Sequence, residues 1–520
     1  VTIAGALNLN TENTRYGAEK IDRLLAGAKK LFFVGIGGIN MCSLAIISAS
    51  RGFIVSGSDR SPSPVTKALT EDGIKVYLTH KKENIAGADA LIYTISIPCD
   101  NPEYTEATRM GIPRISRADF LGWLMKDSKY RIGVSGMHGK STVTSMIASI
   151  LLEAGVDPTI SSGAVLPALG RSYRAGKSKY FLFEACEYKD SFLSFYPNIA
   201  VVLNIDMDHP DYFKSIPQIK ESFRRYMSIS AAAGGVAVVN WSDENVRDAC
   251  RGSGCRLIKF GTSLDEDAVY HGEYDFYADK ITLSPRAAEF LLYESGAFAA
   301  AIRLSEGGLH NVRDAIAAAT ACRAAGISMQ DIKRGLEAFR GAARRMEFVG
   351  KTSSGADIFL DYAHHPTEIK VTLEAARATG GKIICIYQPH TYSRTAALLD
   401  GFARALSIAD EVILADIYAA RETNDSGISS ERLADAVNEV GGNAICTGAI
   451  LKNHSDGAVY SFNPTSHAQN SPLNDFFPHP PKDEFVRAAR FAAANAHAGD
   501  TIIVMGAGDI YETADILKNM

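Results

Sequence analysis

The sequence predicts an α/β protein of three domains, and three observations support this fold class. Short segments rich in Val, Ile, Leu and Phe alternate with helix-periodic segments along most of the 520 residues. Many of these apolar segments end in Gly, Asp, Glu or His, as strands of open parallel sheets do at their functional edge. The pattern restarts after breaks at 126–130 and 341–345, which places the predicted domains at 1–128, 129–343 and 344–520.

The composition is that of a globular protein and argues against several functional classes. Hydrophobic residues make up 46% of the chain and charged residues 22%. A net charge of -5 offers no basic stripe for nucleic acid. The sequence has neither an apolar run long enough for a membrane span nor a basic-then-apolar leader, so membrane insertion and secretion are not expected. The eight cysteines are scattered without a C-x-x-C pair, which indicates reduced thiols in a cytoplasmic protein.

The first predicted domain is Rossmann-like. Residues 1–20 lack a sustained period and are expected to form a poorly ordered lead-in. The expected elements that follow are a strand at 31–34, a turn at 35–38, a helix at 41–50, a strand at 52–56, a strand at 90–96 and a helix from Asp100. Gly35, Gly37 and Gly38 would let a phosphate approach the helix N-terminus, and Asp59 would bind ribose hydroxyls. The G-x-G-G spacing is a partial dinucleotide fingerprint, so the kind of nucleotide stays open.

The second predicted domain opens with a phosphate-binding loop. A β-branched strand containing Ile132 and Val134 runs into a glycine-flanked turn and then a helix. The candidate nucleotide-binding residues of this loop are Gly136, His138, Gly139, Lys140, Ser141 and Thr142. Backbone amides and the helix N-terminus would converge on an anion, Lys140 would add positive charge, and a hydroxyl would reach magnesium. The match is to G-x-x-G-K-[ST], because Gly133 lies one position too early for the longer fingerprint.

Two later strands of the same domain deliver acids at their carboxyl ends. A strand at 180–184 ends in Glu184, where a phosphate-bound magnesium would need an oxygen ligand. A strand at 199–203 is followed by Asp206, Asp208 and His209. Each acid alone is typical of a cap or a surface salt bridge, but two such strand ends after one phosphate loop favour a metal site. Further strands are expected at 231–240 and 256–260, and a helix at 310–325, where His310 or Asn311 is compatible with a simple cap.

The third predicted domain is a second Rossmann-like α/β sheet. Its four expected strands lie at 358–361, 382–387, 411–416 and 501–505, and a helix is expected from Thr367. Each strand leads into a polar cluster, which predicts a functional edge of the sheet. Residues 453–483 lack any period and are interpreted as a long surface insertion, with no ligand spacing among their histidines.

Together these stretches resemble the Mur ligase family of peptidoglycan synthesis, and most closely its alanine-adding members. The matching motifs run in the family's order over residues 30–515: Val34–Gly38 with Ser56–Asp59, Gly136–Thr142, Glu184–Tyr188 with Asp208-His209, His310-Asn311, Asp361–Pro366, Gln388–Thr395 and Gly506–Asp509.

The resemblance implies an ATP-dependent ligase with Mg2+. Its first domain would hold UDP-N-acetylmuramate, the second would hold ATP and magnesium, and the third would close over the second. In the family's reaction ATP phosphorylates the lactyl carboxylate of the UDP-sugar, and the amine of L-alanine attacks the resulting acyl phosphate to form an amide. The expected partners are therefore these two small molecules, with no nucleic acid and no membrane insertion, in a monomer or homodimer.

The same resemblance assigns roles to individual residues. Lys140 would contact the β- and γ-phosphates, and Ser141 and Glu184 would bind magnesium. His209 would bind or position a metal near the sugar carboxylate. The remaining assignments are Asn311 to adenine, Arg345 and Asp361 to the ATP phosphates or ribose, and Tyr362, His364 and Arg394 to the sugar carboxylate or alanine. His364 is also the candidate acceptor of the amine's proton, against an equally weighted structural role beside Pro366.

Three departures from the family pattern bear on these expectations. Met137 stands where the usual loop has a Thr, and Thr391 stands where many relatives have an Arg. The later ligases of the pathway have a carbamylated lysine about fourteen or fifteen residues after the His of the Asp-His pair. Phe223 and Arg224 occupy those positions here, which favours the alanine-adding member.

Three alternative functions stay open at this point. One is the recycling ligase that joins a ready-made tripeptide to UDP-N-acetylmuramate, although 190–197 resembles the alanine ligases better. A nicotinamide-dependent dehydrogenase would use the first glycine turn and Asp59 but leaves the Gly-Lys-Ser loop unexplained. A non-catalytic nucleotide-binding regulator would bind ATP without consuming it, and Lys140, Glu184 and His209 argue against it.

Overall fold

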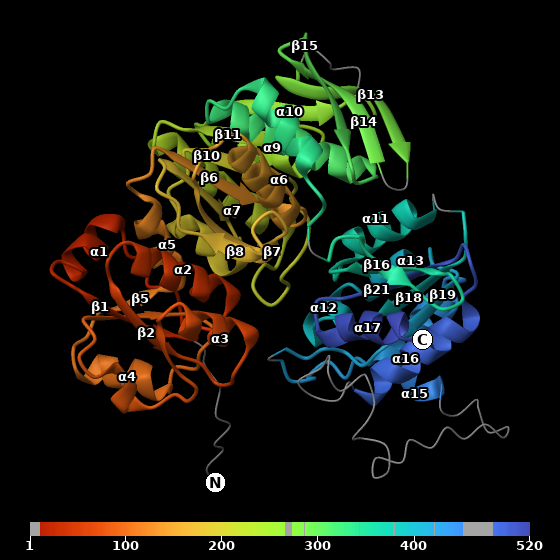
Figure 1. Ribbon diagram of the computed structural model, residues 1–520, viewed down its shortest axis with the longest axis horizontal. Coiled ribbons are helices and arrows are strands. Elements are labelled where there is room, and N and C mark those ends of the chain that lie inside the picture. The colour runs from red at the N-terminus through yellow and green to blue at the C-terminus, as the bar shows by residue number, and fades with distance from the viewer. Residues whose placement is uncertain are drawn as a thin grey trace.

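The computed structural model describes residues 11–265, 273–284, 287–342, 344–377, 380–420, 422–450 and 482–520. The strands of these residues form three sheets that follow one another along the chain. Figure 1 shows them as three separate α/β bodies, red to orange, yellow to green and cyan to blue, here called the N-terminal, central and C-terminal domains. The predicted insertion at 453–483 lies outside the described residues except for its last two positions.

The N-terminal domain contains a parallel sheet with strand order β3-β2-β1-β4-β5. Its strands are β1 (Lys30–Val34), β2 (Ile54–Ser58), β3 (Lys75–Tyr77), β4 (Ala90–Tyr93) and β5 (Arg114–Ser116). Its helices are α1 (Ala18–Leu24), α2 (Ile39–Ser50), α3 (Pro64–Glu71), η1 (Lys82–Ile85), α4 (Pro102–Arg109) and α5 (Arg117–Met125). Because the order reverses beside β1, the glycine turn after β1 lies at the switch point, where open α/β sheets bind ligands.

The expectation of a loose lead-in over residues 1–20 is wrong for the part that the structure describes. The backbone amide of Thr11 donates to the carbonyl of Ile97 at 3.1 Å. The Thr14 hydroxyl donates to Asp119 at 2.6 Å, and α1 already begins at Ala18. These bonds reach groups far away in the sequence, so no local period marks them.

The central domain has a ten-stranded sheet with strand order β15-β14-β13-β12-β11-β10-β6-β9-β7-β8. Its strands are β6 (Tyr130–Ser135), β7 (Thr159–Leu166), β8 (Arg171–Arg174), β9 (Tyr180–Glu184), β10 (Ile199–Val202), β11 (Val236–Asn240), β12 (Arg256–Thr262), β13 (Phe276–Ser284), β14 (Ala287–Glu294) and β15 (Ala297–Leu304). Its helices are α6 (Lys140–Glu153), η2 (Tyr188–Ser194), α7 (Ile216–Ala232), α8 (Glu244–Cys250), α9 (Leu309–Ala324) and α10 (Met329–Ala338).

The middle of this sheet is parallel and carries the predicted ligands. β6 lies between β9 and β10, so the phosphate loop after β6 is flanked by the carboxyl ends of the strands that lead to Glu184 and Asp206. The strand expected at 231–240 begins later, because Ala231 and Ala232 end helix α7 and the strand starts at Val236. The antiparallel β13–β15 ribbon was not predicted.

The C-terminal domain has a six-stranded sheet with strand order β16-β17-β21-β18-β19-β20, parallel except for β16. Its strands are β16 (Glu347–Lys351), β17 (Asp357–Asp361), β18 (Ile383–Tyr387), β19 (Glu411–Leu414), β20 (Ala444–Cys446) and β21 (Thr501–Met505). Its helices are α11 (Pro366–Arg377), α12 (Tyr392–Ala397), α13 (Leu399–Leu406), α14 (Ser430–Glu439), α15 (Thr447–Ile450), α16 (Asp483–Asn495), η5 (Asp509–Tyr511) and α17 (Glu512–Lys518).

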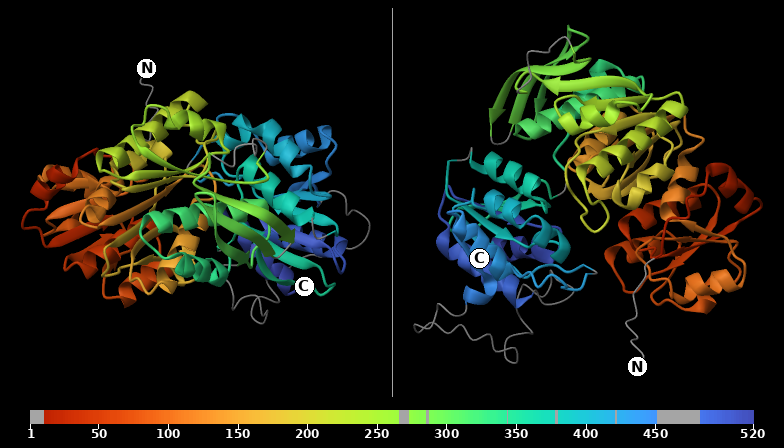
Figure 2. Two further views of the ribbon diagram at one scale, coloured as in Figure 1. Left: turned by 90° about the horizontal axis from the view of Figure 1, so that it is seen from above. Right: turned by 180° about the vertical axis from the view of Figure 1, so that it is seen from behind.

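The central domain lies between the other two, as both further views show (Figure 2). One apolar cluster contains side chains of both the N-terminal and the central domain, among them Phe33, Phe120, Phe183 and Phe195. The two apolar clusters of the C-terminal domain draw their described members from that domain alone. Among the described helices, none is long and apolar enough to cross a membrane.

Candidate functional site

The phosphate loop connects β6 to α6 and depends on two glycines with positive φ. Gly136 has φ +141° and Gly139 has φ +84°, values that side chains rarely adopt. A Cβ on Gly139 would also lie 3.0 Å from Oδ1 of Asp314, a tight contact that would require the Asp314 side chain to shift. Helix α6 begins at Lys140, directly after the turn. The loop therefore presents a helix N-terminus with a lysine in its first turn, which suits an anion.

Lys140 is held by its own loop and by an acid from the neighbouring strand end. Its Nζ donates to the carbonyl of Gly136 at 2.6 Å and lies 3.1 Å from a carboxylate oxygen of Glu187. Burial works to lower the pKa of Lys140, but the charge and hydrogen bond of Glu187, together with Cys186 and Glu184, raise that pKa overall. Glu187 also lies 3.3 Å from Nε2 of His209. The lysine is therefore cationic and sits in a charged cluster that includes a predicted metal-binding residue.

The three predicted metal ligands lie near this cluster but do not form a set. Ser141 is the second residue of α6, and Glu184 ends β9 with its Oε1 accepting a hydrogen bond from Ser162 at 2.7 Å. His209 faces Glu187 rather than Glu184. Within the described part of the chain, no hydrogen bond or ion pair joins any two of these three side chains. The assignment of Ser141, Glu184 and His209 to one metal site stays a prediction.

A cavity of about 780 Å³ opens beside the phosphate loop, between the central and C-terminal domains. Six of the residues predicted to bind nucleotide line it: His138, Gly139, Thr142, Asn311, Arg345 and Asp361. Gly308 is the N-cap residue of helix α9, so Asn311 is not the cap of this helix. The side-chain amide of Asn311 donates to the carbonyl of Gly307 at 2.7 Å. Burial raises the pKa of Asp314 in the same wall to about 8.

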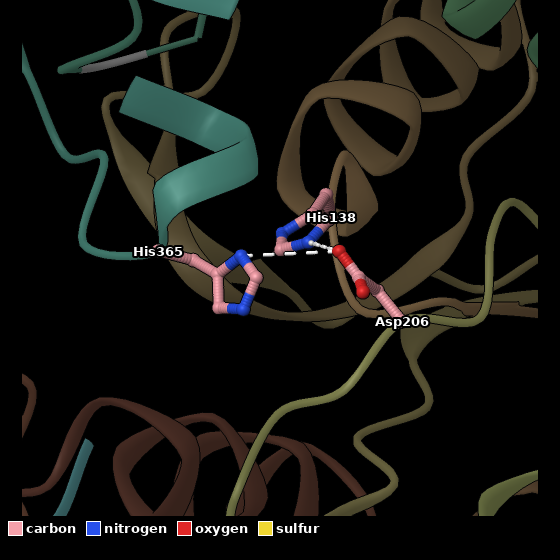
Figure 3. A group of neighbouring side chains, drawn as sticks. All are labelled: His138, Asp206 and His365. Carbon is pink, nitrogen blue, oxygen red and sulfur yellow. Dashed lines mark hydrogen bonds and ion pairs between the residues drawn. The ribbon is translucent and has the colours of Figure 1, made fainter. Parts of the chain in front are cut away.

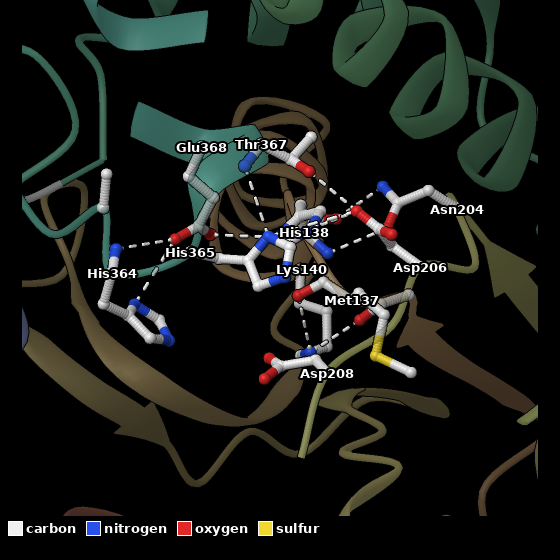
Figure 4. Close-up of polar contacts among 12 residues, drawn as sticks. Met137, His138, Lys140, Asn204, Asp206, Asp208, His364, His365, Thr367 and Glu368 are labelled. Carbon is white, nitrogen blue, oxygen red and sulfur yellow. Dashed lines mark hydrogen bonds and ion pairs between the residues drawn. The ribbon is translucent and has the colours of Figure 1, made fainter. Parts of the chain in front are cut away.

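A polar seam joins the central domain to the C-terminal domain beside this cavity (Figure 4). The Thr367 hydroxyl donates to Asp206 at 2.7 Å, and Nε2 of His365 lies 3.0 Å from the carbonyl oxygen of Met207. Arg394 donates from Nε to Asp208 at 2.9 Å, and both side chains are buried. The predicted substrate-binding residue Arg394 is thus bound to the loop that follows β10.

Glu368, in the first turn of α11, is the centre of the seam. It lies 3.3 Å from Arg345, 3.4 Å from Nδ1 of His138 and 3.3 Å from Nδ1 of His364. Burial opposes its ionisation, yet Arg345 and the two histidines hold the pKa of Glu368 well below its usual value. It therefore ties the phosphate loop to two of the predicted C-terminal site residues, Arg345 and His364.

The histidines of the seam are shifted in opposite directions. Burial works to lower the pKa of His138, but hydrogen bonds to Asp206 and Glu368 raise it to about 9. Burial lowers the pKa of His364 to about 3, because Glu368 does not outweigh the loss of solvent. At neutral pH His138 is therefore a cation, whereas His364 is a neutral imidazole whose low pKa makes it a weak base.

Tyr362 lies at the edge of this group, 36% exposed, with the guanidinium of Arg345 5.8 Å from its ring centre. Its backbone carbonyl lies 3.0 Å from Nδ1 of His364. Asp361 accepts hydrogen bonds from the backbone amides of Met346 and Ala363. Its carboxylate therefore stabilises the backbone before β16 and after β17.

The glycine turn of the N-terminal domain forms a separate site, away from the cavity. The amide of Gly35 donates to the carbonyl of Ser58 at 2.8 Å, and Gly38 precedes α2 as its N-cap residue. Asp59 accepts from the amide of Gly37 at 2.8 Å and from that of Arg60 at 2.7 Å. Its carboxylate therefore stabilises the glycine turn after β1. That Asp59 binds ribose stays a prediction.

The departures from the family pattern have structural explanations. Met137 is buried in the apolar cluster shared with the N-terminal domain. Thr391 donates to Glu422 at 2.7 Å. Phe223 packs against Phe192 with ring centres 5.2 Å apart, so the position is part of the core.

The sequence reasoning missed three charged residues of the site: Glu187, Asp314 and Glu368. Glu187 lies inside the motif Glu184–Tyr188, but no role is predicted for it from the sequence. Glu368 follows a helix-initial proline, a pattern that is ordinary for a helix start and carries no functional signal by itself. Asp314 lies one turn beyond Asn311 on α9, a spacing that would have placed it on the same helix face.

The fold and the site define a class: a phosphate-loop enzyme with a cavity between two α/β domains and a further Rossmann-like domain before them. Family models match part of each of the three domains. They are described as "Mur ligase family, catalytic domain" at 30–129, "Mur ligase middle domain" at 134–322 and "Mur ligase, glutamate ligase domain" at 344–462. The chain belongs to the Mur ligase family.

Similar proteins include curated UDP-N-acetylmuramate–L-alanine ligases. The one from Agathobacter rectalis is 40% identical over 94% of this chain and 97% of its own length. The one from Caldicellulosiruptor bescii is 41% identical over 94% of this chain and 98% of its own. Among solved structures, the UDP-N-acetylmuramate–alanine ligase from Thermotoga maritima matches with a TM-score of 0.70 at 24% identity, covering 94% of this chain and 97% of that chain. At this identity the structural match shows the fold.

Proposed function

We propose that this chain is the ATP-dependent ligase that joins L-alanine to the lactyl carboxylate of UDP-N-acetylmuramate in peptidoglycan synthesis. The observation that carries the proposal is the near full-length similarity, at about 40% identity, to relatives of that name. The site agrees with the chemistry, because a phosphate loop with a cationic lysine faces a second domain across one cavity.

The first half-reaction brings a carboxylate against the γ-phosphate of ATP, so negative charge must be neutralised. Lys140 would exchange its contact with Glu187 for the β- and γ-phosphates, and the amides of the loop would hold the phosphate oxygens. His138 is cationic at neutral pH and lines the same cavity, so it adds to the positive field there. Arg345 would contribute from the other wall.

The residues present fit a magnesium ion at the start of α6. The hydroxyl of Ser141 and the carboxylate of Glu184 are hard oxygen donors, which Mg2+ prefers. Gly163 leaves open space beside Glu184, because a Cβ there would lie 2.9 Å from Oε2. When bound, Mg2+ would neutralise charge on the phosphates. Ser141 and Glu184 would hold it, while the nitrogen of His209 is a weaker match for this ion.

The second half-reaction needs an amine that has lost its proton. His364, the predicted proton acceptor, has one ring nitrogen engaged by the Tyr362 carbonyl and Glu368. Its pKa of about 3 makes it a weak base in this state, so substrate binding would have to raise that pKa for His364 to take the proton of the amine. Arg394, anchored by Asp208, would orient a carboxylate of the sugar or of alanine. Contact between the two domains would keep water from the acyl phosphate.

The test is phosphate release from ATP and Mg2+ in the presence of UDP-N-acetylmuramate, with L-alanine, L-serine, glycine or the tripeptide in separate reactions. Release that depends on both the sugar nucleotide and L-alanine supports the proposal. Phosphate release only in the reaction with the tripeptide would assign the chain to the recycling ligase. If no phosphate were released with any of the four acceptors, a ligase function would be contradicted.

A further inference from the structure

Three side chains with metal-binding atoms meet where the central and C-terminal domains touch (Figure 3). His138 comes from the phosphate loop, Asp206 from the segment after β10, and His365 from the residue before α11. Their ligand atoms all lie within 4.8 Å of one another. Among the described histidine, cysteine and acidic residues, this is the set of three that approaches so closely. None of the three was assigned to the magnesium site.

The distances within this set are close to those of a tetrahedral zinc site. Oδ2 of Asp206 lies 3.5 Å from Nε2 of His138 and 4.0 Å from Nδ1 of His365. Zinc bound tetrahedrally at its usual bond lengths separates neighbouring ligand atoms by about 3.4 Å. Of the three edges, the one between Asp206 and His138 therefore already has about the required length, and the one between Asp206 and His365 would shorten by about half an ångström. The edge between the two histidines is at most 4.8 Å and also has to shorten, which needs side-chain rotation.

Both histidines are oriented through their second ring nitrogens. Nε2 of His365 lies 3.0 Å from the Met207 carbonyl, so that nitrogen carries hydrogen and Nδ1 has the lone pair. This Nδ1 accepts a hydrogen bond from the backbone amide of Thr367 at 3.3 Å and lies 4.0 Å from Asp206, so a metal at this nitrogen replaces that hydrogen bond. Nδ1 of His138 lies 3.4 Å from the Glu368 carboxylate, which leaves its Nε2 for Asp206. A carbonyl or carboxylate on the other ring nitrogen is the arrangement that metal-binding histidines use. The Thr367 hydroxyl orients the carboxylate itself, at 2.7 Å.

We propose that His138, Asp206 and His365 bind a zinc ion that bridges the central and C-terminal domains. Imidazole nitrogens with one carboxylate suit Zn2+ rather than Mg2+, so this site is chemically distinct from the one at Ser141 and Glu184. Zinc displaces the proton that Nε2 of His138 carries at neutral pH, and this proton is released to solvent. The metal then takes the place of the direct contact between His138 and Asp206, and a water completes the tetrahedron. Zinc binding therefore links the two domains at the wall of the cavity that His138 and Asp206 line.

The test is a zinc titration of the full chain, free of nucleotide and magnesium, in competition with a chromogenic chelator. Cysteines and surface histidines give a background, so the comparison is between variants. His365→Ala and Asp206→Asn should each bind one tight equivalent fewer than the parent protein, and zinc should raise the unfolding temperature of the parent but not of these variants. The exposed His497 has no place in the set, so His497→Ala should match the parent.

Cobalt(II) gives a second readout that names the ligands. The parent should show the visible absorption of a four-coordinate cobalt site without the ultraviolet band of thiolate ligation, and both variants should lose it. Circular dichroism shows that each variant is folded, and either folded variant is sufficient for the comparison. Equal tight zinc stoichiometry in the parent and in a folded variant would overturn the proposal, and so would a thiolate band that persists in both.

Discussion

The two contacts of the central domain differ in the kind of side chain that dominates them. Toward the N-terminal domain, aromatic side chains from both sides share one apolar cluster, and the Ser194 carbonyl lies close against Gly122. Toward the C-terminal domain, the contact is a seam of buried charges and hydrogen bonds that includes Arg394–Asp208 and the group around Glu368. A charged ligand offers apolar side chains no favourable contact, so it does not compete with their packing. Charged side chains at a cavity can exchange their protein partners for a charged ligand. We infer that nucleotide acts on the second contact and leaves the first unchanged.

The largest expected effect comes from the lysine beside the polar seam. Lys140→Ala removes the charge that would meet the phosphates, and the rate of alanine-dependent phosphate release should fall by at least about 100- to 1,000-fold. The exposed Lys67→Ala is the matched control and should keep the parent rate. Undiminished activity in folded Lys140→Ala would remove the phosphate loop from the reaction.

Breaking the buried ion pair across the seam should have the next largest effect. Arg394→Ala leaves Asp208 buried without its partner, and the free energy of unfolding should fall by about 3–5 kcal/mol. Arg432→Ala, which removes an exposed pair with Glu439 in the same domain, should cost less than about 1 kcal/mol. Denaturant unfolding of both variants measures the difference, and equal costs would mean that the seam contributes no more than a surface pair.

The apolar contact is tested by adding volume instead of removing charge. A Cβ at Gly122 would lie 2.0 Å from the Ser194 carbonyl oxygen, so Gly122→Ala should cost about 1–3 kcal/mol through displaced backbone. Gly17→Ala meets nothing within 4 Å and should be nearly neutral. Neither change should alter the apparent affinity for ATP, since this contact lies away from the cavity. A changed ATP affinity in Gly122→Ala would contradict the division between the two contacts.

The stability that the polar seam contributes should fall at both alkaline and acidic pH. The pKa of His138 is raised to about 9, so its stabilisation is complete below the unfolded value of about 6.5 and is lost as pH rises toward 9. The pKa of His364 is lowered to about 3, so stability falls as pH drops below about 6.5 and the unfolded chain binds a proton. The thermal unfolding temperature should fall by about 2–4 °C for each kcal/mol of stability lost at either end of the pH range. His138→Gln should remove the alkaline decline and keep the acidic one.

The sequence alone was sufficient where function rests on neighbouring residues. The turn from Gly136 to Lys140 and the strand that ends at Glu184 are local patterns, and both lie in the predicted elements. The β13–β15 ribbon was missed because Ala297 to Ala301 has the composition of a helix, and pairing with β14 overrides that preference.

The seam could not be predicted because its partners lie far apart in the chain. Arg394 and Asp208 are 186 residues apart, and Thr367 and Asp206 are 161 apart. Each of these four residues lies in or beside a motif found in the sequence. No rule of sequence spacing predicts which of them contact each other. Residues 11–17 were misjudged for the same reason, since Thr11 and Thr14 bond to Ile97 and Asp119. Tertiary contacts of this kind leave no periodic trace.

The most direct test of the contrast between the two contacts is hydrogen exchange with and without a non-hydrolysable ATP analogue and Mg2+. The amides at 205–209 and 362–369, on the two sides of the seam, should change their exchange rates when nucleotide binds. The amides of α5 and η2, which meet at Gly122 and Ser194, should exchange at the same rates in both states. Altered exchange at α5 and η2 with an unchanged seam would contradict the account.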